Sequence, residues 1–258
     1  MEPEPCLGVT ELVVLDLETT GMGPCPPERA LEVAVVRLAP DATPLGEWET
    51  LLQPERPVEA SWLHGITDAM LLGAPRFAEI AGELAGWLQD AIVVGHNPAF
   101  DLGFLRGELA LCGRELPRLP LLCTRELTRR LYPDLDSYRL GSCCAWFGIR
   151  RARAHAAIDD AHATAALLRA LLLVARLRGL HGLEALGGEP GEPLRASWWD
   201  GSGPAWPRRA QALPRWAVQP RGQEPAAPAP HPAPAYTAAT AGTPTAPPPD
   251  GSLSPAGW

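Results

Sequence analysis

The chain has 258 residues, which is enough for one large domain or for one ordinary domain followed by an extension. Its formal net charge of −8 argues against a general binder of polyanions, although ten arginines against five acids gather between Arg106 and Arg153. The N-terminus lacks the layout of a signal peptide and no apolar run is long enough to cross a bilayer, so we expect a soluble cytoplasmic protein without a membrane segment.

Hydrophobic periodicity predicts the elements in chain order. Short β-rich runs predict strands, and apolar residues recurring with a helical period predict helices. The predicted strands are 12–17, 31–38, 47–52, 91–94 and 119–123, and the predicted helices are 77–88, 98–111, one after 123, one near 140–147, and 157–178, which ends at Gly179. Three early strands followed by alternating helices and strands predict an α/β domain with a mixed sheet.

The composition changes after about residue 187. Residues 190–258 hold 16 of the 30 prolines and five of the nine tryptophans, and such a segment cannot bury a core. We therefore expect an N-terminal extension at 1–9, a folded domain at 10–187 and a disordered Pro/Ala/Trp-rich tail at 188–258. The part of the tail from Trp198 to Trp216 either docks a partner or packs back on the domain.

The six cysteines show no C-x-x-C spacing, which favours reduced thiols over zinc ligands or disulfides. Two of them, Cys143 and Cys144, lie in a predicted helix and are expected to be small core residues.

Four acids and one histidine form the strongest chemical pattern. Asp16 and Glu18 are two residues apart on the first predicted strand, so both side chains project from one face. Asp101 and Asp160 arrive from later segments, and His155 precedes Asp160 by five residues. Carboxylates packed this closely stay ionised only around a cation, and Mg²⁺ or Mn²⁺ prefers their oxygen atoms. The pattern predicts a metal-dependent enzyme that cleaves phosphodiesters.

Two divalent cations about 4 Å apart can bracket a scissile phosphate. Such a site needs a proton acceptor for the attacking water, and His155 suits this role because its ordinary pKa lies near neutrality. The arginines between residues 106 and 153 form either a solvated helix face or a basic rim that holds a nucleic-acid backbone beside the acidic centre.

Three motifs in order resemble the DEDDh family of 3′–5′ exonucleases, within the DnaQ-like superfamily that includes proofreading subunits of DNA polymerases. They are LDLETTG at 15–21, HNPAFDLGFL at 96–105, and the segment from His155 to Leu168. Two shorter segments, LHGIT at 63–67 and SYRL at 137–140, also fit. The resemblance covers about residues 10–178, and it implies a ribonuclease H-like fold with a five-stranded mixed sheet flanked by helices.

The resemblance also implies a role for each motif residue. Asp16 would bridge two cations, Mg²⁺ or Mn²⁺, with Glu18 and Asp160 completing the first site. Asp101 would hold the second cation, and His155 would be the general base. Contacts with the terminal nucleotide, for which local hydrogen bonding or packing is the alternative, would come from Thr19, Thr20, His64, Ile66 and Asn97.

Three neighbouring residues compete for these roles. The family pattern selects Asp160 over Asp159, which is expected to face solvent. His162 lies inside the predicted helix beyond the aspartate, so His155 is preferred as the base. His96 is expected to be structural.

The predicted activity is release of nucleoside monophosphates from a single-stranded or frayed 3′ end of nucleic acid. DNA is the favoured substrate, in proofreading or repair, and a DNA polymerase or repair protein could bind through the tail. The alternatives are an exoribonuclease that trims RNA 3′ ends, a catalytically silent module that binds a partner, and a hydrolase of small nucleotides.

Overall fold

A five-stranded mixed sheet forms the centre of the fold in the computed structural model, which describes residues 10–23, 28–58, 61–151, 155–195 and 198. Its strands are β1 (Glu11–Thr19), β2 (Ala30–Leu38), β3 (Pro44–Leu51), β4 (Ala91–Gly95) and β5 (Leu121–Cys123). They are ordered β3-β2-β1-β4-β5. The first three strands are antiparallel neighbours, whereas β4 runs parallel to both β1 and β5. The predicted five-stranded mixed sheet is confirmed.

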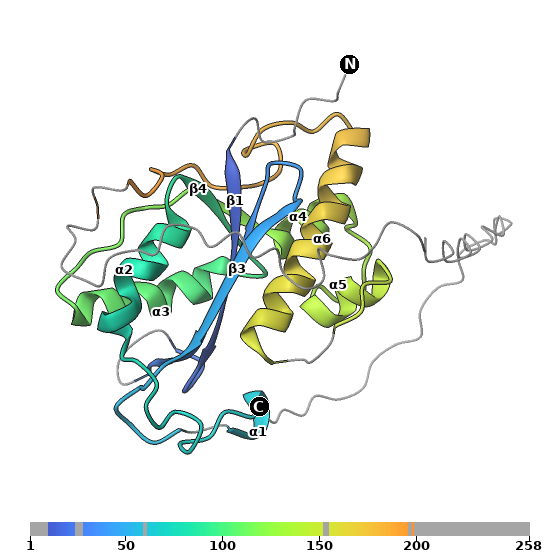
Figure 1. The fold of residues 1–258 in the computed structure, drawn as a ribbon. Helices are drawn as coiled ribbons and strands as arrows, with labels where there is room; N and C mark the ends of the chain where they lie inside the picture. The colour runs from blue at the N-terminus through green and yellow to red at the C-terminus, as the bar shows by residue number, and fades with distance from the viewer. Residues whose placement is uncertain (1–9, 24–27, 59–60, 152–154, 196–197, 199–258) are drawn as a thin grey trace, which may run out of the picture. The chain divides into compact units, whose positions relative to one another are not determined.

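Helices cover both faces of this sheet (Figure 1). The helices are α1 (Ser61–His64), α2 (Phe77–Leu88), α3 (Pro98–Leu111), α4 (Thr124–Leu131), α5 (Leu140–Trp146) and α6 (Ala157–Leu177). Buried side chains of α2 and α3 form one core with the sheet, and those of α4, α5 and α6 form the other. Only the four-residue α1 was not predicted, because so short a helix has no periodic signal. Among the described residues, no helix is both long and apolar enough to traverse a lipid bilayer.

The alternation of side chains along β1 determines which face its acids share. Leu12 and Val14 belong to the core beneath α6, whereas Val13, Leu15 and Leu17 belong to the core beneath α2 and α3. Because successive side chains alternate, Asp16 and Glu18 continue the row of Leu12 and Val14 on the α6 side.

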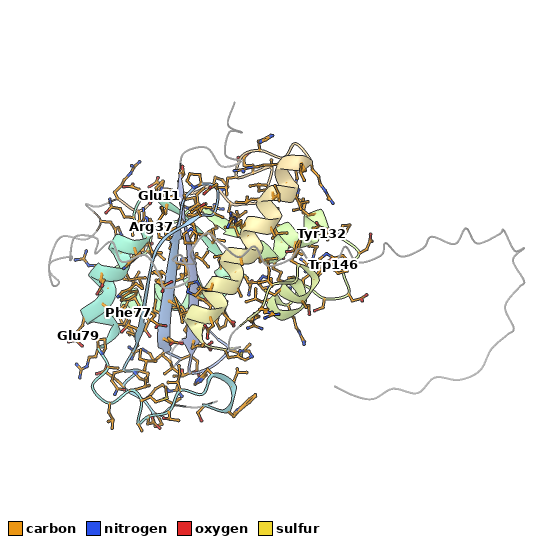
Figure 2. The ribbon with its side chains drawn as sticks, turned by 45° about the vertical axis from the view of Figure 1, so that its right-hand side comes forward. Glu11, Arg37, Phe77, Glu79, Tyr132 and Trp146 are labelled. Carbon is orange, nitrogen blue, oxygen red and sulfur yellow. The ribbon has the colours of Figure 1, made fainter. Side chains whose placement is uncertain are left out.

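An ion pair between Glu11 and Arg37 joins β1 to β2 at the end of the sheet where β1 begins, opposite Asp16 and Glu18 (Figure 2). The Arg37 Nε donates to Glu11 Oε2 at 2.5 Å, and its Nη atoms donate to the backbone carbonyls of Trp87 and Gln89. Each of the three guanidinium nitrogens therefore has an acceptor, and these bonds tie β1 and β2 to the end of α2. The acids at the far end of β1 have no comparable cation on the strand itself.

The chain continues to pack on the domain beyond residue 187, where the sequence predicted a boundary. Glu189 bridges Leu121 in antiparallel fashion, and Leu194 forms a parallel bridge with Gln89 and is 2% exposed. Trp198 packs against the core of α2 and α3, and its indole N–H donates to the Glu115 carbonyl at 3.2 Å. At Trp198 the structure thus shows the tail packed back on the domain. The rest of the predicted tail, 199–258, lies outside the described residues, as does the predicted extension 1–9.

The cysteines within the described residues are free thiols. Cys143 and Cys144 are 0% and 1% exposed on α5, so their prediction as core residues is confirmed.

Candidate active site

The first two acids lie at the end of β1, beyond the point where β4 pairs with it. The pairing of β1 with β4 reaches only Val14 and Val94, whereas β1 pairs with β2 as far as Thr19. Glu18 is 9% exposed and Asp16 is half-buried. The end of β1 therefore carries two partly buried carboxylates beyond the last residue of β1 that pairs with β4.

Asp101 approaches the same end of β1 from the first turn of α3. Gly95 ends β4, and a Cβ atom there would lie 3.0 Å from Pro98 Cβ, so the turn needs a glycine. Asn97 has φ 97° and ψ 55°, a left-handed conformation that asparagine tolerates, and Pro98 starts the helix. Asp101 Oδ1 then accepts a 3.1 Å hydrogen bond from the Leu17 amide, and the side chain is 7% exposed.

Asp160 and His155 come from the start of α6. Asp160 lies in the first turn and is 8% exposed, whereas His155 precedes the helix, is exposed and has φ 62°. The His155 amide donates to Asp160 Oδ2 at 3.4 Å. This hydrogen bond holds the His155 backbone against the first turn of α6, and a ring nitrogen of His155 lies near the Asp160 carboxylate.

Glu32 on β2 is a fifth acid that the sequence analysis did not identify. It pairs with Glu18 across the β1–β2 ladder, and its Oε2 accepts a 2.9 Å hydrogen bond from the Ala157 amide. A carboxylate at a helix N-terminus satisfies a free amide and the positive end of the helix dipole. Glu32 therefore anchors the start of α6 to the sheet. Its place in a predicted strand gave no sign that it meets Glu18 and the start of α6, because both contacts are long-range.

Glu18, His155 and Asp160 form a compact group of metal-ligand atoms. One ligand atom from each lies within 4.8 Å of the other two. Asp16 and Asp101 are outside this group but within electrostatic range of it. The two carboxylates offer hard oxygen ligands, which suit Mg²⁺ or Mn²⁺, and the imidazole nitrogen beside them is placed to accept a proton.

Burial raises the pKa values of three of these acids, and neighbouring carboxylates raise those of Glu18 and Asp16 further. Burial, followed by the charges of Asp160, Glu32 and Asp101, raises the pKa of Glu18 to about 8. Burial raises the pKa of Asp101 to about 7, against the hydrogen bonds from its own amide and that of Leu17. The pKa of Asp16 is raised first by burial and then by the four surrounding carboxylates. A bound cation would relieve this repulsion and keep the acids ionised.

Arg151 provides positive charge at this group. Its Nε donates to Asp160 Oδ1 at 3.1 Å, and its Nη2 donates to the same oxygen. Its charge also opposes the rise in the pKa of Glu18. Arg151 belongs to the basic segment that was predicted to be either a solvated helix face or a rim, and nothing in the sequence indicated which of its arginines meets the acids.

Two other arginines of that segment lie in different surroundings. The charge of Arg125 acts on His96 near the acids, and Arg129 pairs with Glu126 at 2.6 Å in an exposed position. Arg129 also lies over the Tyr138 ring, 4.9 Å from its centroid. Arg129 thus fits the solvated helix face, while a rim that holds a nucleic-acid backbone stays a prediction.

His96 is held by structural hydrogen bonds. Its Nε2 is 2.8 Å from the Tyr138 carbonyl, an acceptor, so this nitrogen carries a proton. In the neutral ring its Nδ1, 2.9 Å from the Thr124 hydroxyl, is an acceptor, and the one hydroxyl proton can go either to this nitrogen or to the Gly95 carbonyl at 3.2 Å. Burial lowers the pKa of His96, which favours this neutral form. Both ring nitrogens are therefore occupied, in keeping with a structural residue that joins β4 to the segment before α5.

The competing residues on α6 point elsewhere. His162 Nε2 is 3.1 Å from Glu47 Oε2 on β3, whereas the His155 ring lies beside Glu18 and Asp160. Asp159 is half-buried rather than fully exposed, and it is outside the group that Asp160 joins.

The residues predicted to touch substrate occupy different environments. The Thr19 hydroxyl donates to the Gly21 carbonyl at 2.7 Å, and the Thr20 hydroxyl donates to Glu28, so both make local hydrogen bonds. Asn97 is exposed at the turn before α3.

The LHGIT segment lies at α1, beyond the ends of the strands. Ile66 is 3% exposed and packs with Leu31 and Leu71, so its side chain supports this segment from beneath. His64 Nδ1 accepts a 3.1 Å hydrogen bond from the Ile66 amide. Trp62, two residues earlier, is 84% exposed and was not predicted as a site residue.

Comparisons with known proteins agree with this architecture. The RNase T family model, described as exonuclease, matches residues 13–168. The PolC-type DNA polymerase III of Bacillus subtilis is 36% identical over 171 residues, which are 65% of this chain and 12% of that protein. A DNA polymerase III subunit epsilon-like protein of Rhodobacter capsulatus is 35% identical over 174 residues, 65% of this chain and 24% of the relative. The chain thus spans a minor part of each of these relatives.

A solved structure of exonuclease X in complex with 5′ overhanging duplex DNA is 26% identical to the chain. It has a TM-score of 0.51 and covers 65% of this chain and 93% of that one. Together with the sheet order, this likeness confirms the predicted ribonuclease H-like fold. The chain belongs to the exonuclease family, and all five residues of the predicted catalytic set lie within the matched region. The resemblance predicted from the three motifs is confirmed.

Proposed function

We propose that the protein is a DEDDh-type 3′–5′ exonuclease that uses two divalent cations to release nucleoside monophosphates from single-stranded or frayed DNA ends. The observation that carries the proposal is the convergence of Glu18, His155 and Asp160 within 4.8 Å, inside the region that matches the exonuclease family. This set supplies hard oxygen ligands and a nitrogen base at one place.

Each residue has a definite task in this reaction. Glu18, Asp160 and Asp16 would hold one cation, and Asp101, with Asp16, would hold the other. Bound divalent cations supply a water of lowered pKa and stabilise the departing 3′ oxygen. His155 accepts the proton of the attacking water at its ring nitrogen, and its exposed position lets the proton pass to solvent.

DNA is proposed as the substrate because the relatives point toward DNA metabolism. Two carry the name of DNA polymerase III, and the exonuclease X structure contains DNA. The proposed setting is therefore proofreading or repair. Binding of a polymerase or repair protein through the tail is a proposal about residues 199–258, which lie outside the described structure.

The test is a gel time course with two 5′-labelled single strands of identical sequence, one DNA and one RNA, in Mg²⁺ or Mn²⁺. A ladder that shortens from the 3′ end of DNA and vanishes with a chelator supports the proposal. Asp160→Asn and Asp159→Asn form a matched pair on adjacent residues, and only the first should abolish the ladder. A ladder on RNA alone would reassign the substrate, and no ladder from folded, metal-loaded protein would reject the catalytic function.

A further inference from the structure

Arg151 is held at the acidic site by two contacts to one carboxylate oxygen. Its side chain is 20% exposed and that of Asp160 is 11% exposed, so the pair is largely shielded from water. Charge-assisted hydrogen bonds in such surroundings are stronger than those of a surface ion pair. Arg151 therefore holds the Asp160 carboxylate as long as no metal ion competes for it.

The fold leaves room for this guanidinium. Gly141 on α5 faces it, and a Cβ atom at Gly141 would lie 3.2 Å from Arg151 Nη1. That distance is short for a carbon contact, so the bare glycine allows the guanidinium to lie against α5. Arg151 thus has a place between α5 and the start of α6 as well as a partner.

The same oxygen cannot serve two cations equally well. Asp160 would hold the first cation together with Glu18, and Arg151 uses its Oδ1. The other oxygen, Oδ2, accepts from the His155 amide, so a divalent cation that takes Oδ1 competes with Arg151 for it and weakens their contact. The released guanidinium would then lie beside the place where a strand is cleaved, and its planar fork matches a phosphate as well as a carboxylate.

We propose that Arg151 serves two anions in turn: Asp160 in the metal-free protein, and a phosphate of the bound DNA strand once a divalent cation has taken Asp160. Arg151 is then both a competitor of the metal and a positioning residue for the substrate backbone. This inference rests on the proposed nuclease function.

The first arm of the test measures metal binding without nucleic acid. Calorimetric titration of the chelator-stripped full chain with Mn²⁺ compares the wild type with Arg151→Met and Arg125→Met. Arg125 is the control, since its charge acts on His96 near the site while the cation paired with Asp160 is Arg151. We expect Arg151→Met to bind Mn²⁺ about tenfold more tightly, because the cation no longer displaces a charge-assisted pair, and Arg125→Met to change the affinity much less.

The second arm measures the metal-free protein and the substrate. Arg151→Met should have a lower melting temperature in chelator and should gain more from added Mn²⁺ than the wild type. On single-stranded DNA its KM should rise about tenfold with a smaller change in kcat, since a lost phosphate contact weakens binding of substrate and transition state alike. Arg151→Lys, which keeps the charge without the fork, should recover part of the KM.

Unchanged Mn²⁺ affinity in Arg151→Met, or an equal gain in Arg125→Met, would overturn the competition with the metal. Unchanged KM would overturn the phosphate contact. Both results leave the nuclease function intact if the wild type still shortens DNA. A wild type that neither binds Mn²⁺ nor shortens DNA would instead overturn the proposed function and this inference together.

Discussion

The Leu17 amide and the Asp101 carboxylate, 84 positions apart in the chain, are joined by a 3.1 Å hydrogen bond. The bond replaces a missing strand contact, because β4 pairs with β1 only as far as Val14. A buried amide without an acceptor is costly, so the first turn of α3 is fixed against the end of β1. The Asp101 side chain therefore supplies the acceptor that β4 does not provide, and it brings a further acid to the end of β1 that carries Asp16 and Glu18.

Two substitutions of Asp101 should separate these roles. Asp101→Asn can still accept the Leu17 hydrogen bond and removes a charge from the cluster, so we expect stability equal to or above that of the wild type. Asp101→Ala leaves the amide unpaired and should lower the free energy of unfolding by about 1–3 kcal/mol. Both should lose nearly all nuclease activity. Urea unfolding in chelator measures the difference, and equal stabilities for the two variants would show that the hydrogen bond contributes little.

The raised pKa values predict that the metal-free protein becomes less stable as pH rises. A carboxyl group whose pKa is raised by folding binds more protons in the folded state, so stability falls as pH rises from the unfolded value to the folded one. For Glu18 this interval runs from 4.5 to about 8, and for Asp101 from 3.8 to about 7. Melting temperatures in chelator should fall across these intervals.

Mn²⁺ should remove much of this decline, because a cation keeps the acids ionised at a lower cost. Glu18→Gln should flatten the decline in chelator without any metal, since it removes one of the titrating groups. A melting temperature in chelator that rises steadily from pH 4.5 to pH 8 would contradict the cause assigned to these shifts.

Two histidines near α6 provide a matched test of the general base. His155→Ala should lower kcat by about 10²–10⁴-fold while leaving Mn²⁺ binding measurable. His162→Ala, which removes the partner of Glu47 on β3, should stay close to the wild-type rate. The measurement is single-turnover cleavage of a 5′-labelled DNA strand. Equal losses in both variants would indicate a structural effect of α6 and would remove His155 from the proposed chemistry.

Features with a short sequence period could be predicted, whereas long-range side-chain pairs could not. The spacing of two between Asp16 and Glu18 placed both acids on one face of a strand, and the alternation of β1 explains why that face meets α6. Arg151 meeting Asp160 depends on how α5 and α6 pack, which leaves no pattern in the sequence. The strand-like bridge of Leu194 was hidden by the high proline content around it.

Arg29 and Glu108 form another long-range ion pair, like that of Arg151 with Asp160, and breaking it should lower the free energy of unfolding strongly. Glu108 is 3% exposed and accepts from Arg29 Nε and Nη2 at 2.9 Å each, and also from the Ala30 amide. Glu108→Ala takes the acceptor from the Ala30 amide and from Arg29 Nε and Nη2, although Arg29 Nη1 keeps the Pro54 carbonyl, so the substitution should cost about 3–5 kcal/mol. Glu126→Ala, which breaks the exposed pair with Arg129, should cost less than about 1 kcal/mol. Urea unfolding of both variants checks the contrast, and similar losses would show that burial does not govern it.

Leu194 tests whether the segment after residue 187 belongs to the folded domain. It is 2% exposed in the core of α2 and α3, and its carbonyl accepts a 2.9 Å hydrogen bond from the Asp90 amide. Leu194→Ala in the full chain should therefore lower the free energy of unfolding by about 2–5 kcal/mol, through lost burial and the cavity left behind. Leu177→Ala is the control, because Leu177 at the end of α6 is 81% exposed and its truncation should change stability by less than about 0.5 kcal/mol. If the two variants unfold at the same urea concentration, residues 188–195 add nothing to the core, and the domain ends where the composition changes.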